Sequence, residues 1–164
     1  MDDIARLSAR DRADVFAASA AALQEQIGVS PLILEKDFWV CWSLQKLFML
    51  EGIPGLLFKG GTSLSKGYAL IGRFSEDIDL VLDRRTFDVP DPREPGIGSK
   101  ERERRCDALK ATSENYIQEE FLPRITAVIH EALGTSGWST ELDPVEKDCI
   151  NFYYPPSLDA TDYG

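Results

Sequence analysis

The chain has 164 residues, a hydrophobic fraction of 43% and a formal net charge of −10. This length and hydrophobic content predict one folded domain over residues 1–164 and argue against disorder. No apolar run approaches the roughly 18 residues that a membrane span needs. The N-terminus also lacks a secretory signal, so we expect a cytoplasmic protein without a membrane partner, whose three scattered cysteines stay reduced.

Two helices are predicted before residue 50. Ser8 as a cap and Gly28 as a stop predict a helix over 9–27. Its expected buried stripe consists of Val15, Phe16, Ala20, Leu23 and Ile27. Ser30 followed by Pro31 begins a second helix that reaches about residue 50. The side chains expected to face inward from it are Leu34, Phe38, Cys41, Trp42, Leu44 and Phe48.

Three consecutive charged residues, Glu35, Lys36 and Asp37, interrupt the apolar run of this second helix. They form a charged outer edge, or else Lys36 or Asp37 faces a functional site. Consecutive residues do not share one face of a helix, so at most part of this trio serves a site.

The rest of the chain alternates between helical and extended patterns. After the turn 52–55 we expect a short strand over 56–58, and after the Pro- and Gly-rich loop 88–99 a helix over 100–118 capped by Ser99. A further helix over 121–133 ends at Gly134, and strands follow over 138–142 and 148–154. These patterns predict an α+β (mixed α/β) fold, with a small mixed sheet packed against helices. Its parts are a helical lead-in (1–50), a glycine turn and acidic strand (56–82), helices (99–134) and strands (138–154).

The most informative segment combines a glycine turn with two acids. A strand leads into Gly60-Gly61, a short helix follows, and the next strand carries Asp77 and Asp79. Alternation along a strand places both carboxylates on one side, where two like charges need a cation or a proton. Mg²⁺ binds carboxylate oxygens together with substrate phosphates, and a glycine turn offers backbone N–H groups to a phosphate. This layout predicts a nucleotidyl-transfer site.

Two other interpretations of the segment are possible. A P-loop needs a glycine before its lysine and Ser or Thr after it, whereas Lys66 follows Ser65 and precedes Gly67. The P-loop interpretation therefore fails. The alternative is a plain tight turn beside a solvated strand edge, and the turn, spacing and acid pair together argue against it.

The order Gly-Gly-Thr, spacer, Asp-x-Asp between apolar residues resembles the signature of polymerase-β-like nucleotidyltransferases. The longer strings 58–66 and 73–80, with 34–40 upstream, more narrowly resemble the AbiEii/AbiGii-type toxins of type IV toxin–antitoxin and abortive-infection systems. This resemblance covers roughly residues 30–85.

The resemblance implies transfer of a nucleotide from a nucleoside triphosphate, with Mg²⁺ held by Asp77 and Asp79. It implies an RNA end or a protein as acceptor, and a cognate antitoxin that acts without direct contact. Lys66 or Arg73 would neutralise charge that develops during transfer. The expected nucleotide-binding residues are Gly60, Gly61, Thr62, Ser63, Lys59, Arg73 and Ser75.

Two-metal phosphoryl transfer usually employs a third carboxylate, which members of the resembled family carry farther along the chain together with a lysine. Glu141, Glu146 and Asp148 lack the expected apolar–acid–apolar setting. We therefore expect a domain that is incomplete at its C-terminus, binds Mg²⁺–nucleotide weakly and turns it over poorly. The alternative function is a catalytically incomplete nucleotide-binding or partner-binding module.

The negative charge fits a small nucleotide better than a long polynucleotide footprint. Local basic clusters are Lys59, Lys66 and Arg73, then Arg84-Arg85, then 100–105, which is best explained as a solvated helix face. At the other end of the chain, we expect an exposed apolar surface that supports self-association, formed by Phe152, Tyr153 and Tyr154.

Overall fold

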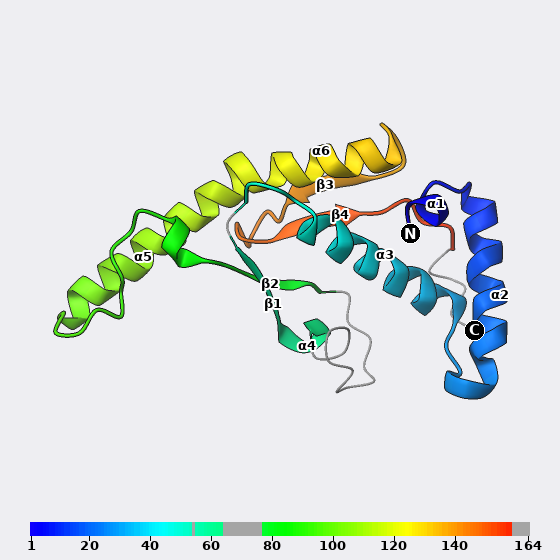
Figure 1. Cartoon of the computed structure of the whole chain (residues 1–164), viewed down its shortest axis with the longest axis horizontal. Helices are drawn as coiled ribbons and strands as arrows, with labels where there is room; N and C mark the ends of the chain where they lie inside the picture. The colour runs from blue at the N-terminus through cyan, green and yellow to red at the C-terminus, as the bar shows by residue number, and fades with distance from the viewer. Residues whose placement is uncertain (54, 64–76, 159–164) are drawn as a thin grey trace.

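Helices and two short antiparallel ribbons build the fold, which confirms the predicted α+β class (Figure 1). The structure is a computed structural model that describes residues 1–53, 55–63 and 77–158. The helical elements are α1 (Asp2–Ala5), α2 (Ala9–Ile27), α3 (Pro31–Phe48), α4 (Gly60–Thr62), η2 (Arg84–Thr86), α5 (Ser99–Tyr116), η3 (Ile117–Phe121) and α6 (Leu122–Leu133). The strands are β1 (Leu56–Lys59), β2 (Asp79–Leu82), β3 (Ser139–Leu142) and β4 (Ile150–Tyr153).

The first two long helices begin and end where the local signals place them. The Ser8 side chain accepts a hydrogen bond from the Asp11 N–H, and Gly28 ends α2 in the left-handed conformation with φ 57°. Ser30 caps α3 in the same way, accepting from the Ile33 N–H. These caps satisfy backbone donors that helix geometry leaves unpaired, so local sequence defines both helices.

The inward face of α3 differs from the predicted one. Its buried residues are Leu32, Glu35, Trp39, Val40, Trp42 and Leu47; those at 32, 35, 39 and 42 are spaced by three or four and define one helical stripe. Of the predicted set only Trp42 is buried, and Phe48 is half exposed. The prediction was correct for Trp42 and in part for Phe38, which packs against the core, but it missed the burial of Glu35. Burial of Glu35 becomes possible through partners from the distant end of the chain.

Those partners form a buried charged cluster between α2, α3 and residues 155–158. The Glu35 carboxylate accepts hydrogen bonds from the Ser157 N–H at 2.7 Å, the Ser157 hydroxyl at 2.5 Å and the Leu158 N–H at 3.2 Å. Arg12 donates to the Pro155 carbonyl at 2.9 Å. Burial lowers the pKa of Arg12, and the charge of Glu35 partly opposes that shift. The cluster fastens the segment after β4 onto both helices.

Aromatic packing places β4 over the middle of α3. Phe152 stacks on Trp42 with ring centroids 5.9 Å apart, and Tyr154 stacks on Trp39 at 5.3 Å. The expected exposed surface at Phe152 and Tyr154 is therefore wrong, because these rings find partners in the tryptophan pair. Tyr153 points outward, and its hydroxyl donates a hydrogen bond to the Glu141 carboxylate.

The helix α5 extends away from this core at the end of the molecule opposite α2 (Figure 1). Gly98 rather than Ser99 occupies its N-cap position, because Ser99 is already helical. Glu101 forms ion pairs with Arg104 and Arg105, both at 2.7 Å, so the mixed-charge run is the solvated face that was predicted. None of the helices in the described ranges is long and apolar enough to cross a membrane.

Candidate active site

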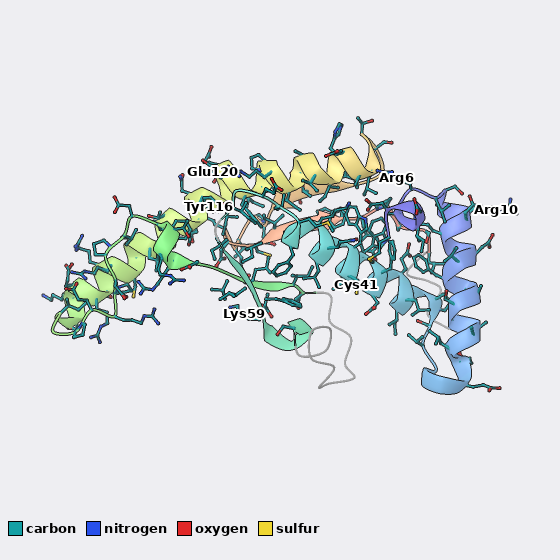
Figure 2. All side chains as sticks on the ribbon, viewed as in Figure 1. Arg6, Arg10, Cys41, Lys59, Tyr116 and Glu120 are labelled. Atoms are coloured by element: carbon teal, nitrogen blue, oxygen red, sulfur yellow. The ribbon has the colours of Figure 1, made fainter. Side chains whose placement is uncertain are left out.

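The ribbon of β1 and β2 carries the acidic motif. Its antiparallel register pairs Lys59 with Asp79 and Leu57 with Val81. These four residues are exposed, whereas the residues between them along each strand are half-buried. We call the side that carries Leu57, Lys59, Asp79 and Val81 the outward face. Lys59 lies where β1 leads into α4 (Figure 2).

The opposite side of the ribbon packs on the hydrophobic core. Leu56, Ile78 and Leu80 are partly buried against it, and the Phe58 ring lies 6.4 Å from that of Phe48. The strand β2 begins at Asp79, so Asp77 lies just before it and not on it as predicted, although Asp77 is exposed like Asp79. Both acids are therefore exposed while Ile78 and Leu80 pack against the core, which leaves the two carboxylates accessible to a ligand.

Gly60 brings the backbone of the turn against the Asp79 carboxylate. Its φ is +74°, and a Cβ added there would lie 2.7 Å from the Asp79 Cγ, closer than carbon atoms pack. At Gly61 a Cβ would meet nothing within 4 Å. Gly60 therefore has both a positive φ and no room for a side chain, which only glycine tolerates, whereas Gly61 has open space.

The structure describes only some of the other predicted nucleotide-binding residues. Ser63 is buried, and its hydroxyl donates to the Gly60 carbonyl at 3.2 Å, so this side chain braces the turn. Outside the described residues lie Lys66, Arg73, Ser75 and the side chain of Thr62. Their roles stay predictions.

The three consecutive charged residues of α3 lie on different faces of the helix, as helix geometry requires. Glu35 lies in the buried cluster, while Lys36 and Asp37 are half-buried. The Asp37 carboxylate lies 3.9 Å from the Cys41 thiol one turn later. Cys41 lies on α3 in Figure 2.

The candidates for a third carboxylate lie on β3 and the β3–β4 loop. Glu141 accepts from Tyr153, while Glu146 and Asp148 are exposed. Burial raises the pKa of Cys149, and the charges of Asp143, Glu146, Asp148 and Asp77 add to this effect. Within 1–53, 55–63 and 77–158, no three acidic, histidine or cysteine side chains come together as a metal cluster.

The donor set fits Mg²⁺ in its chemistry. Asp77 and Asp79 supply accessible carboxylates, and the missing Cβ of Gly60 lets the turn backbone approach Asp79. Mg²⁺ is commonly bound by one or two carboxylates, with phosphate and water oxygens completing its octahedron. The sequence pattern singled out these acids but did not indicate that Lys59 pairs with Asp79 across the ribbon. The residues between the two strands are too many for a hairpin rule to set their register.

An α+β domain that joins a glycine turn to an acid-bearing ribbon has the layout of a nucleotidyltransferase. The family model described as Nucleotidyl transferase AbiEii toxin, Type IV TA system, matches residues 44–161. The chain therefore belongs to this family of nucleotidyltransferase toxins. No curated protein and no solved structure matches it.

Proposed function

We propose that this chain transfers a nucleotide from a nucleoside triphosphate to an acceptor, as the Mg²⁺-dependent toxin of a cytoplasmic toxin–antitoxin system. The observation that carries the proposal is the contact of Gly60 with the Asp79 carboxylate. This contact supports a single site in which the glycine turn would hold phosphates beside the acidic strand. The cognate antitoxin is expected to act without touching the toxin, as in other type IV systems.

In this proposal Asp77 and Asp79 hold Mg²⁺, which neutralises phosphate charge when bound. The backbone N–H groups of the Gly60-Gly61 turn orient the β- and γ-phosphates, and Lys59 beside Asp79 contributes positive charge. An acceptor oxygen attacks the α-phosphorus, the bond to the bridging oxygen breaks, and pyrophosphate leaves. The nucleotide is also bound by Thr62, Ser75 and Arg73 in this proposal. Lys66 stabilises the negative charge that develops during transfer.

Replacing Asp79 by Asn tests the proposal, with Asp107→Asn on the exposed face of α5 as a control. Titration calorimetry with Mg²⁺ and each nucleoside triphosphate measures binding, and transfer of a labelled nucleotide measures turnover. Asp79→Asn should cost at least about 10²-fold in transfer, the usual scale for removing a group that stabilises charge in the transition state. Measurable transfer that is equal in Asp79→Asn and wild type, or Mg²⁺–nucleotide binding that is equal in the two, would contradict the assignment.

A catalytically incomplete nucleotide-binding or partner-binding module is the second candidate. It is favoured by one observation, that no cluster of three acids forms within the part of the chain that the structure describes. Binding of Mg²⁺–nucleotide that depends on Asp79, without any transfer, would support this candidate.

A further inference from the structure

The outward face of the β1–β2 ribbon has an apolar centre. Leu57 is 65% exposed and Val81 is 37% exposed, and the strand register sets these two residues opposite each other. On the other side of the ribbon, Leu56 and Leu80 pack against the core. Side chains that are opposite each other on one face of a sheet are in contact. The ribbon therefore presents a small continuous apolar surface to solvent.

One end of this face is acidic and the other end is basic. The acidic end, beside the glycine turn, carries the exposed Asp79. The basic end carries Arg85 and Arg93, whose side chains are 81% and 74% exposed. The apolar pair lies between the two ends, so charge of opposite sign is separated along one surface.

The basic end keeps a positive excess after its own ion pairs are counted. Arg85 pairs with Asp83 at 2.6 Å. Arg84 pairs with Asp91 at 2.5 Å, and Arg93 lies 3.7 Å from the same carboxylate. Three guanidinium groups thus meet two carboxylates. A recess of about 580 Å³ lies between these side chains and the ends of the strands, which leaves room for side chains of another molecule.

A face with this order of charges is complementary to a second copy of itself. In a two-fold symmetric contact, residue i of one copy meets residue j of the other, and j meets i. With the axis near Leu57 and Val81, each apolar pair meets the other copy's apolar pair. Asp79 lies about 7 Å from Val81 along β2, so the rotation carries it toward the arginines of the other copy. Sheets pack face to face about 10 Å apart, a distance that a long arginine side chain can cross.

We propose that two copies of this chain dock through their outward faces, with Leu57 and Val81 at the centre and the Asp79 carboxylate of each copy beside Arg85 and Arg93 of the other. A second copy fits better than an unrelated partner, because this single face supplies both members of each charge pair. The face is small, and small interfaces are typical of weak, transient contacts. The dimer therefore forms in a concentration-dependent way.

Docking also covers the candidate active site. The contact encloses Asp79 and the adjoining Gly60 turn, so the dimer excludes Mg²⁺–nucleotide and is a resting form. This regulatory consequence rests on the proposed function, whereas the contact itself does not. A ligand that binds only the monomer shifts the equilibrium toward the monomer. Mg²⁺–nucleotide should therefore dissociate the dimer.

Sedimentation velocity of the 164-residue chain over a concentration series measures the contact. The buffer has an ionic strength of about 0.15 M, at which a Debye length of about 8 Å screens the general repulsion between two acidic copies. The variants are Asp79→Lys and Arg85→Glu/Arg93→Glu. Arg104→Glu is the matched control, because Arg104 is also exposed and ion-paired but lies on α5.

The wild type and Arg104→Glu should dimerise alike, and each of the two other variants alone should dimerise at least about tenfold more weakly, because like charges then face each other across the interface. An equimolar mixture of Asp79→Lys with Arg85→Glu/Arg93→Glu should form a heterodimer. In the mixture the introduced lysine faces the introduced glutamates, while the native aspartate faces the native arginines. A fluorescent label on one variant identifies the heterodimer.

Three results overturn the contact. They are a wild type that stays monomeric throughout the series, variants that dimerise like the wild type, and folded variants that form no heterodimer when mixed. Circular dichroism checks folding. Leu57→Gln, at the exposed centre of the face, tests the same contact without reversing a charge and should also weaken dimerisation. Equal dimerisation by Leu57→Gln and the wild type overturns the contact as well.

Addition of Mg²⁺–nucleotide separates the inference from the proposed function. Each nucleoside triphosphate is added with Mg²⁺ to the wild-type dimer, and calorimetry measures its binding. A lower dimer fraction on binding supports the resting form, whereas a dimer that binds Mg²⁺–nucleotide without dissociating overturns it. If the wild type dimerises through this face but binds no Mg²⁺–nucleotide, the contact stands and the proposed function fails.

Discussion

Charged side chains are buried in one region of the molecule and exposed to solvent in another. In the buried cluster, Glu35 is fully enclosed and receives three hydrogen bonds from residues 157 and 158, while Arg12 reaches backbone carbonyls. Asp79 on the outward face of the ribbon and Asp77 just before β2 remain exposed. The first arrangement fastens chain segments together, and the second keeps carboxylates available to a ligand.

The difference follows from the cost of removing charge from water. A buried carboxylate is tolerated only when hydrogen bonds and an opposite charge replace its hydration. The carboxylates of the ribbon retain access to water, and their position comes from strand register and from the backbone of Gly60. The family match covers residues 44–161 and therefore includes the segment 155–158. This segment is held by Arg12 and Glu35, which both lie before the matched region.

The largest expected effect comes from breaking the buried cluster with Glu35→Ala. This change leaves Arg12 without its opposite charge and removes the acceptor for the Ser157 and Leu158 N–H groups. The free energy of unfolding should fall by about 3–5 kcal/mol, measured by urea denaturation. The control Glu25→Ala, at an exposed position of α2, should change it by less than about 0.5 kcal/mol. A loss below about 1 kcal/mol for Glu35→Ala would contradict the role of the cluster.

The second-largest effect is expected at Gly60 and not at its neighbour Gly61. Gly60→Ala introduces a Cβ at positive φ against Asp79 and should cost about 1–3 kcal/mol of stability. It should also weaken Mg²⁺–nucleotide binding, because the Asp79 carboxylate must move. Gly61→Ala has open space and should leave that affinity nearly unchanged. Calorimetry on both variants checks this, and equal affinities in the two would show that the Gly60–Asp79 contact is unimportant for binding.

The smallest effect concerns exposed ion pairs and pH. Hydrogen bonds from Arg85 lower the pKa of Asp83 from 3.8 to about 2, and those from Arg104 and Arg105 lower the pKa of Glu101 from 4.5 to about 2. Because both pKa values are depressed in the folded state, their stabilisation is present above the ordinary values and is lost as pH falls toward about 2. Exposure and salt screening keep the contribution small.

The double variant Asp83→Asn/Glu101→Gln tests this titration. Its free energy of unfolding should depend less on pH in that acidic window than that of the wild type, as measured by urea denaturation at a series of pH values. An unchanged pH dependence would mean that other carboxylates dominate acid unfolding, such as Asp143, whose pKa is lowered by the N–H groups of its own loop.

The sequence by itself determined the features that depend on nearby residues. Ser8, Gly28 and Ser30 marked helix ends because caps act within one turn. The alternation of Asp77, Ile78, Asp79 and Leu80 indicated which side of the strand carries the acids, since that period is local. The glycine turn and the acid pair also indicated the family that the match over 44–161 established.

Only the tertiary structure decided which face of α3 lies inward, because that depends on partners more than a hundred residues away. Phe152 and Tyr154 are covered for the same reason. The pairing of Lys59 with Asp79 and the gathering of Arg84 and Arg93 beside Leu57 likewise arise from strand register and loop packing. Such contacts are selected by the total burial and hydrogen bonding of the folded chain, and no local pattern encodes that choice.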